Sequence, residues 1–215
     1  DSALGELDGP YDAVFSCAGV SDPHPQLMKI NFIGQRCIID TLEADGRLAD
    51  GGAVAMISSI GGVGWQSEVP QALDFLANDA WDSMNAWVDA HDGTNNYVFS
   101  KVAMNTYVAH RAFSFAGKNM RINAIMPGAT DTPLARKHAD TWLPFQGEYR
   151  EATGKPHLTP EQMGDTLAFL CMDAASGING CLVTVDDGYV PSTIAGSFES
   201  PVVEMMLGLG SDASE

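Results

Sequence analysis

Short apolar runs and amphipathic stretches alternate along the chain. Apolar runs that end in small or polar residues predict buried strands, each with its exit turn, within residues 12–19, 53–59, 121–128 and 181–188. Apolar residues at helical spacing predict helices at residues 27–45, 98–117 and 159–173. Because buried strands that alternate with amphipathic helices form βαβ units, the pattern predicts a doubly wound α/β fold with a parallel sheet covered on both faces.

The composition fits one hydrophobic core. The chain has 215 residues, of which 45% are hydrophobic and 18% charged, a balance typical of a single globular domain. No internal repeat and no low-complexity linker divides it. We therefore expect residues 1–215 to form one domain.

The charge balance argues against two classes of partner. A formal net charge of -17 repels phosphate backbones and anionic lipid surfaces, and no run of lysine or arginine offsets it locally. No apolar run approaches the roughly 20 residues that a membrane helix needs, and no signal peptide heads the chain. The four cysteines form no C-x-x-C pair, which favours thiols in a reducing compartment. These features predict a cytoplasmic protein that binds neither nucleic acid nor membrane.

Polar and small residues follow each predicted strand, where parallel sheets bind their ligands. In addition, Tyr97 and Lys101 stand one helical turn apart at the start of the helix after the second strand, so their side chains share a face. A tyrosine and a lysine at this spacing occur by chance in many helices, and the pair alone predicts little. The pair becomes more informative together with the polar and small residues after the strands, which are Ala18, Gly19, Ser58, Ser59, Pro127, Gly128, Thr130, Thr132, Asp186, Asp187 and Gly188.

The order of these features resembles the short-chain dehydrogenase/reductase family, over most of the chain from about Asp12 to Gly188. The matching pieces are CAG, NFIG, ISS, YVFSK, PGATDT and VTVDDG, in the family's order and on the predicted elements. The resemblance implies a Rossmann-type sheet and an NAD(P)-dependent oxidoreductase. Such an enzyme interconverts an alcohol and a ketone or aldehyde, with NAD or NADP as cofactor and a small molecule as substrate.

The resemblance also implies catalytic roles. Tyr97 is the expected acid and base, and Lys101 the neighbour that lowers the pKa of Tyr97 from about 10 and holds the nicotinamide ribose. Ser59 matches the serine that stabilises the substrate oxygen, with Ser58 as the alternative one residue away. Asn31 is expected to place water in a proton relay to Lys101, although an amide at this position can also simply bond the local backbone.

Eight residues are expected to hold the cofactor by the same resemblance. Gly19 and Gly128 permit a close approach of the backbone to a ligand, but glycines there also serve turns. No metal is expected, since the five histidines lack metal-ligand spacing. The expected cofactor residues are Ala18, Gly19, Tyr97, Lys101, Pro127, Gly128, Thr130 and Thr132.

One part of the family pattern has no counterpart in the sequence. The glycine-rich loop that holds the cofactor diphosphate is absent, and the chain opens without methionine just ahead of a strand. We expect the first βαβαβ segment of the family to be missing, which removes the residue that separates NAD from NADP and leaves residues 13–16 as an edge strand. The 215-residue chain alone is then expected to bind dinucleotides weakly and to turn over little substrate.

The spacing between Ser59 and Tyr97, 38 residues, is longer than is usual in the family. Within an insertion at about 64–96, apolar residues at helical spacing predict one amphipathic helix over residues 70–91; its stripe is Leu73, Leu76, Trp81, Met84, Trp87 and Val88. The arrangement resembles the 3α-hydroxysteroid dehydrogenase/carbonyl reductase and coniferyl-alcohol dehydrogenase subgroup, which implies a ring-bearing apolar substrate. A second variable segment at about 133–158, with Trp142, Phe145 and Tyr149, takes the place of the family's substrate loop.

The insertion also bears on assembly. Family members pair through the helices at 27–45 and 98–116, which the insertion is expected to cover. We expect a homodimer that uses another surface, such as the helix from Thr159 and the strand from Cys181. Two other functions stay open: a non-catalytic dinucleotide-sensing or protein-binding domain of the same fold, and a sugar-nucleotide epimerase, which usually has a larger C-terminal substrate domain.

Overall fold

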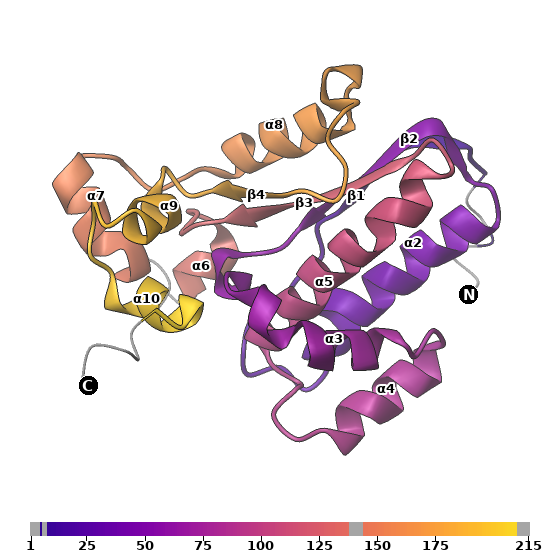
Figure 1. Cartoon of the computed structure of the whole chain (residues 1–215), viewed down its shortest axis with the longest axis horizontal. Helices are drawn as coiled ribbons and strands as arrows, with labels where there is room; N and C mark the ends of the chain where they lie inside the picture. The colour runs from indigo at the N-terminus through magenta and orange to yellow at the C-terminus, as the bar shows by residue number, and fades with distance from the viewer. Residues whose placement is uncertain (1–4, 6–7, 138–143, 210–215) are drawn as a thin grey trace.

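The computed structural model describes residue 5, residues 8–137 and residues 144–209. Within them, four parallel strands form one sheet in the order β1-β2-β3-β4 (Figure 1). The strands are β1 (Tyr11–Ser16), β2 (Leu48–Ile57), β3 (Arg121–Pro127) and β4 (Leu182–Val185). The predicted parallel α/β fold is confirmed, and β1 is an edge strand of the described sheet, as expected.

Helices cover both faces of the sheet (Figure 1). On one face α2 (Gly34–Ala44) and α5 (Tyr97–Ala116) pack against the strands, and on the other lies α8 (Pro160–Cys171). The largest apolar cluster joins the first face to the insertion, whereas a smaller cluster lies under α8. Apolar burial on both faces explains why the strand sequences read as continuous apolar runs.

Short helices gather beyond the carboxyl ends of the strands (Figure 1). Single turns of 3-10 helix occupy Ile60–Gly62, Trp65–Glu68 and Pro144–Gln146 there. A further turn, Asp173–Ala175, lies at the opposite end of the sheet, where the Ala175 carbonyl accepts from Arg121 at the start of β3. A third apolar cluster packs α9, α10 and the turn after β2 together. None of the helices that the structure describes is long and apolar enough to cross a membrane. The short α-helices are α6 (Pro133–Lys137), α7 (Gly147–Thr153), α9 (Tyr189–Ile194) and α10 (Pro201–Leu207).

The insertion differs from its prediction. Instead of one helix over residues 70–91, it forms α3 (Val69–Leu76) and α4 (Trp81–Ala90). The amide of Asn78 donates to the carbonyls of Asp74 and Phe75 and ends α3, and the Ser83 hydroxyl bonds the backbone of Ala80 and starts α4. The polar Asn-Asp step therefore breaks the apolar period.

The break changes which side chains are buried. Phe75 of α3 packs on Trp87 of α4, with ring centroids 5.0 Å apart, and the Trp87 ring nitrogen donates to Asp74 at 2.7 Å. Leu73 and Trp81, which a single helix would bury, are 39% and 45% exposed. The predicted stripe is wrong at these two positions, because the two helices turn their faces independently.

Candidate functional site

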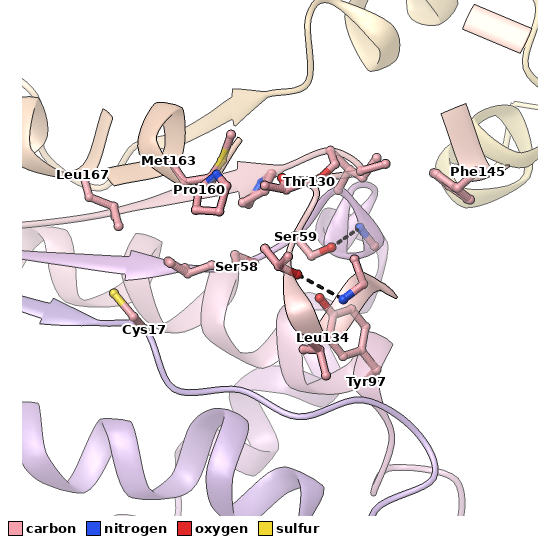
Figure 2. Close-up of a pocket in the computed structure, with 18 of the residues that line it drawn as sticks. Cys17, Ser58, Ser59, Tyr97, Thr130, Leu134, Phe145, Pro160, Met163 and Leu167 are labelled. Carbon is pink, nitrogen blue, oxygen red and sulfur yellow. Dashed lines mark hydrogen bonds between the residues drawn. The ribbon is translucent and has the colours of Figure 1, made fainter. Parts of the chain in front are cut away.

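A cavity of about 530 Å³ lies at the carboxyl ends of β2 and β3 (Figure 2). Its volume is in the range of small-molecule sites. The side chains and turns around it come from separate parts of the sequence, as expected for a site at the strand ends of a parallel sheet. Six of the predicted site residues line it: Ser59, Tyr97, Pro127, Gly128, Thr130 and Thr132.

Tyr97 is the first residue of α5, and the local sequence fixes this position. The side chain of Asn96 caps the helix by accepting the Phe99 N–H at 2.8 Å. Asp22, from the segment after β1, accepts the Tyr97 N–H at 3.0 Å. These two polar caps hold the tyrosine at the cavity wall. Sequence reasoning found the helix start but not Asp22, which lies 75 residues away in the chain.

Ser59 is the second residue after the end of β2 and has an extended backbone. Its hydroxyl oxygen accepts the Gly61 N–H at 3.0 Å, and Figure 2 shows the Ser59 hydroxyl beside that of Tyr97. Ser58 is 2% exposed and donates to the Asn105 side chain at 2.6 Å. Both of the serines that the sequence left open line the cavity. The Ser59 hydroxyl lies beside Tyr97, whereas the Ser58 hydroxyl is bonded to Asn105.

The pKa of Tyr97 does not follow the expectation. Burial raises it above the ordinary tyrosine value, the hydrogen bond with Ser59 opposes that rise, and the charge of Asp22 adds to it. Lys101, which was expected to lower this pKa, stands 5.3 Å from the ring centroid, and its ammonium donates to the Ile57 carbonyl at 2.9 Å. The expectation failed because desolvation of the phenol raises its pKa more than the Ser59 hydroxyl lowers it, and the one charge that acts on it, Asp22, raises it as well.

Lys101 lies beneath the cavity wall and is only 3% exposed. Burial lowers its pKa to about 8. No carboxylate among the described residues forms an ion pair with it. It is therefore a cation at neutral pH that is held only by a carbonyl and an aromatic face.

Asn31 is completely buried in a π-helical turn, Lys29–Ile33, which opens the predicted helix before α2. Its amide accepts the Val20 N–H at 2.8 Å and donates to the Val20 carbonyl at 3.0 Å and to Ser100 at 3.3 Å. The side chain thus bonds local backbone, the second of the two roles left open, and fixes the segment after β1.

Ala18 and Gly19 lie on that segment, are exposed, and do not line the cavity. Sequence reasoning missed the residue that holds them. Gln35 is buried, accepts a hydrogen bond from Ser16, and donates to the carbonyls of Ala18 at 2.8 Å and Asn31 at 2.7 Å. By the resemblance, Ser16 and Cys17 stand where the family usually has asparagines, and this departure is the sequence signal that the turn is held differently.

The turn after β3 is tightly packed against other parts of the protein. A Cβ at Gly128 would lie 2.8 Å from the Gln146 amide nitrogen and 3.0 Å from Asp186, so protein packing itself demands glycine there. The Thr130 hydroxyl donates to the Gly128 carbonyl, and Thr132 accepts the Ala135 N–H and starts α6. Both threonines line the cavity while their hydroxyls serve the turn.

The remaining walls are mainly apolar and were mostly missed. Met163 and Leu167 lie on the helix predicted at residues 159–173, and helical spacing does not separate cavity-facing from core positions. Phe145 was foreseen in the variable segment, whereas Trp142 lies outside the described residues. Within the described ranges, no group of three or more His, Cys, Asp or Glu residues could hold a metal ion. The walls include Cys17, Leu134, Phe145, Pro160, Met163, Leu167 and Met206.

Comparison with known proteins agrees with this geometry. Residues 81–190, just over half of the chain, match the family described as Enoyl-(Acyl carrier protein) reductase. The chain is similar to the cis-4-hydroxycyclohexanecarboxylate dehydrogenase of Sinomonas cyclohexanicum, with 26% identity over 88% of this chain and 69% of that protein. It is also similar to the 3-alpha-hydroxysteroid dehydrogenase/carbonyl reductase of Comamonas testosteroni, with 27% identity over 86% and 75%.

A solved structure shares the fold. The 3-alpha-hydroxysteroid dehydrogenase from Pseudomonas sp. B-0831 superposes with a TM-score of 0.67 at 24% identity, over 93% of this chain and 80% of that one. The family match spans α4, α5, β3, α8 and β4, and so includes Tyr97, Lys101 and the turn after β3. The chain belongs to the short-chain dehydrogenase/reductase family and is an NAD(P)-dependent oxidoreductase.

Proposed function

We propose that this enzyme interconverts a ring-bearing apolar alcohol and its ketone or aldehyde, with Tyr97 as acid and base. The observation that carries the proposal is the pair of neighbouring hydroxyls, Ser59 and Tyr97, at the wall of an otherwise mostly apolar cavity. A carbonyl oxygen seated there meets two hydroxyl donors, and the rest of the substrate meets carbon.

The residues around the cavity fit a nicotinamide cofactor at one end. Beside Tyr97, the backbone of residues 127–130 and the side chain of Thr132 border the cavity, and Lys101 lies behind the tyrosine ring. We assign these residues, with Pro127, Gly128 and Thr130, to the nicotinamide end, and Ala18 and Gly19 to the far end. When bound, the nicotinamide supplies or accepts the hydride.

The hydroxyls of Tyr97 and Ser59 and the ammonium of Lys101 carry out the proton transfer and stabilise charge. Because its pKa is raised, Tyr97 carries its proton at neutral pH and can donate it to a carbonyl oxygen during reduction. Ser59 accepts from Gly61, which leaves its own proton to stabilise charge on the substrate oxygen. Oxidation requires Tyr97 to lose its proton, and the charged Lys101 behind the ring favours the phenolate that results. Asn31 supports the site through Val20, and we keep its water relay as part of the proposal.

The substrate class rests on the cavity walls and on the relatives. Leu134, Phe145, Met163 and Leu167 offer apolar surface and no charge to the substrate. By their names, the related enzymes act on a hydroxycyclohexanecarboxylate, on coniferyl alcohol and on 3-alpha-hydroxysteroids, all of which carry rings. A ring alcohol matches the walls better than a short polar one, since it removes more apolar surface from water.

A panel of alcohols tests the proposal. Cyclohexanols, aryl alcohols and 3α-hydroxysteroids are incubated with NAD⁺ or NADP⁺, beside propan-2-ol as the small control, and formation of reduced nicotinamide is followed. We expect kcat/KM for the ring alcohols to exceed that for propan-2-ol by at least about tenfold. Dinucleotide binding without turnover of any alcohol or carbonyl would favour the non-catalytic alternative.

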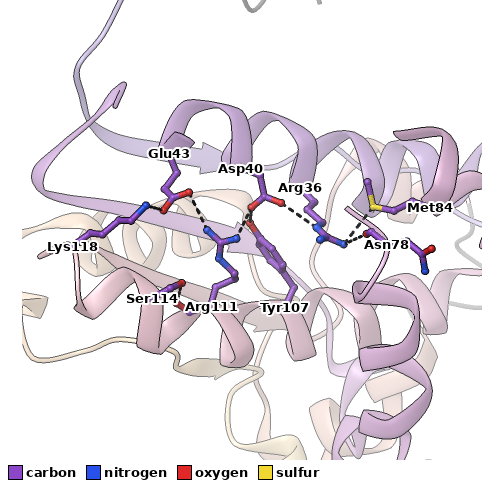
Figure 3. A network of polar contacts seen from close by, with 9 residues as sticks. All are labelled: Arg36, Asp40, Glu43, Asn78, Met84, Tyr107, Arg111, Ser114 and Lys118. Atoms are coloured by element: carbon purple, nitrogen blue, oxygen red, sulfur yellow. Dashed lines mark hydrogen bonds and ion pairs between the residues drawn. The ribbon is translucent and has the colours of Figure 1, made fainter. Parts of the chain in front are cut away.

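We further propose a homodimer that leaves the α2 and α5 face unused. The insertion covers part of that face: Phe75 packs on Phe32 and Phe99, and Arg36 of α2 donates to the Asn78 carbonyl at 2.8 Å (Figure 3). At the same time α8 exposes Phe169, 42% accessible, and is followed by Met172, 59% accessible.

Two substitutions separate the possible faces. In sedimentation experiments, Phe169→Glu on α8 should yield monomers, because a charge would be buried at the proposed contact. Phe113→Glu is the matched control, since Phe113 is 91% exposed on α5, and it should leave the dimer intact. The opposite result would place the contact on α5.

A further inference from the structure

Side chains of α7 and of the turn before it bind both backbone groups of Ala129, in the turn that follows β3. The Gln146 side-chain oxygen accepts the Ala129 N–H at 3.0 Å. Arg150 donates to the Ala129 carbonyl at 2.9 Å, and also to the same Gln146 oxygen at 2.9 Å. We call this pair of side chains the Gln146–Arg150 clamp. Neither residue lines the cavity, whereas Ala129 and its neighbours Gly128 and Thr130 do.

The clamp is buried and closely fitted. Gln146 is 1% exposed and Arg150 8% exposed. Two donors converge on the Gln146 oxygen, which fixes the orientation of the amide, and the amide fills the space that a Cβ of Gly128 would need. The Gln146 amide therefore blocks a shift of the turn toward α7, and a shift away from α7 breaks these bonds and leaves buried donors or acceptors unpaired, which is costly.

The other side of the clamp reaches the exit of β4. Arg150 also donates to the Pro156 carbonyl, and its guanidinium stands 3.8 Å from the Asp187 carboxylate. The Tyr149 hydroxyl donates to the Asp187 carbonyl at 2.8 Å. The short helix α7 is thus anchored to the turn after β4 while it holds the turn after β3.

The residue next to the clamp is part of the cavity wall. Phe145 precedes Gln146 directly and lines the cavity, so one short segment carries both an apolar wall for substrate and the bonds that hold Ala129. A substrate that presses on Phe145 acts on the same backbone that positions Gln146.

We infer that Gln146 and Arg150 are positioning residues that set the turn at residues 127–130 against the nicotinamide end of the site. This inference rests on the proposed function, and it adds a physical link between the substrate wall at Phe145 and the cofactor turn. The pair acts through Ala129 and does not touch the reacting atoms. Cofactor binding therefore depends on it more than the chemical step does.

Arg121 provides a matched control for the arginine. It is also 8% exposed and also donates to backbone carbonyls, those of Leu170 at 2.6 Å and Ala175 at 3.1 Å, but it lies at the opposite end of β3. Arg150→Lys and Arg121→Lys each lose a buried multidentate contact, and both should lower the melting temperature. Only Arg150→Lys should raise the nicotinamide Kd and KM, by about tenfold, with kcat changed less than about twofold.

The glutamine is tested with two substitutions. Gln146→Leu removes the acceptor of the Ala129 N–H, and hydrogen exchange of a peptide covering residues 127–132 should accelerate in the cofactor-free protein. Gln146→Glu keeps an acceptor oxygen beside Arg150 and should restore slow exchange and a cofactor Kd close to that of the wild type.

These experiments distinguish a failure of the inference about the Gln146–Arg150 clamp from a failure of the proposed function. Equal cofactor affinities for Arg150→Lys and Arg121→Lys would overturn the inference, as would unchanged exchange in Gln146→Leu. A wild-type protein that binds no nicotinamide dinucleotide would defeat the proposed function instead. In that case the exchange of residues 127–132 still decides whether the clamp holds the turn.

Discussion

Helix α5 carries a tyrosine followed four residues later by a cation twice, as YVFSK at its start and as YVAHR ten residues further on. In both pairs the cation lies over the ring: Lys101 is 5.3 Å from the Tyr97 centroid and Arg111 is 5.7 Å from that of Tyr107. The spacing and the local geometry of the two pairs are therefore nearly the same.

Their surroundings are different. The Tyr107 hydroxyl donates to Asp40 at 2.7 Å, and Arg111 forms ion pairs with Asp40 at 3.0 Å and Glu43 at 3.2 Å (Figure 3). Burial and the charge of Asp40 raise the pKa of Tyr107 well above its usual range. Tyr97 instead lies beside Ser59 at a cavity, and the Lys101 ammonium donates to the Ile57 carbonyl.

The difference teaches what makes such a pair reactive. In the second pair the Tyr107 hydroxyl and the Arg111 guanidinium are both bonded to carboxylates of α2. They therefore stabilise the contact between α2 and α5 and are not available to bind a substrate. In the first pair a hydroxyl faces a cavity and the cation keeps its charge for a ligand. The spacing on the helix provides the proximity, and the partners decide the role.

The largest expected effect is the loss of the Tyr97 hydroxyl. Tyr97→Phe should lower kcat by about 10² to 10⁴-fold with little change in cofactor affinity, because only a proton transfer in the transition state is removed. Tyr107→Phe should leave kcat nearly unchanged and destabilise the fold by about 1–3 kcal/mol, through the lost bond to Asp40. Steady-state kinetics and denaturant unfolding measure both. Equal turnover in wild type and Tyr97→Phe would remove the distinction between the pairs.

A smaller effect on kcat is expected for Ser59, which lies beside Tyr97. Ser59→Ala should reduce kcat by about 10² to 10³-fold, as for other groups that stabilise a developing oxyanion, and should raise the pKa of Tyr97 further. Ser58→Ala is the neighbouring control: it loses the buried bond to Asn105 and should mainly lower stability. A spectroscopic titration of tyrosinate, compared with Tyr97→Phe, reads the pKa. If Ser58→Ala gave the larger loss of turnover, the assignment of the serine would be reversed.

The two cations should respond to removal with opposite signs. The pKa of Lys101 is lowered to about 8 in the folded protein, so the unfolded chain holds this proton more tightly. The resulting penalty, ~3 kcal/mol, is fully present at pH 7 and is relieved as the pH rises from about 8 toward 10.5. Lys101→Met should therefore stabilise the fold at pH 7 by about 1–3 kcal/mol, after loss of the Ile57 bond, while activity is lost.

Arg111→Met is the counterpart on the same helix. It leaves Asp40 and Glu43 without this partner and should therefore destabilise the protein by about 1–3 kcal/mol. The loss is smaller than for a fully buried pair, because the arginine is partly exposed and solvent screens its ion pairs. Unfolding free energies measured from pH 6 to pH 10 test both variants. A Lys101→Met protein that is less stable than wild type at pH 7, or that keeps the wild-type slope above pH 8, would contradict the account of a desolvated lysine.

Much of this arrangement could be predicted from the sequence, because periodicity and strand ends are local signals. Tyr97, Ser59 and the turn at residues 127–130 meet as expected, since parallel strands bring their carboxyl ends to one edge. The bonds of Gln35, Asp22 and Gln146 could not be foreseen, because each joins segments whose distance in space depends on the complete fold. The pKa direction of Tyr97 was wrong for a related reason: desolvation depends on all the neighbours of the phenol and not on the one lysine that the motif names.

The helices α3 and α4 lie in the sequence between Ser59 and Tyr97, two residues whose side chains lie beside each other at the cavity (Figure 2). The segment between them is therefore a closed loop whose ends are held by the sheet and by α5. By chain statistics, tripling the length of such a loop costs only about 1 kcal/mol of closure entropy. The apolar contacts of Phe75 and Trp87 can offset that cost. Segments of other lengths and sequences can therefore be exchanged at this point, by evolution or by design, while the two hydroxyls stay in place.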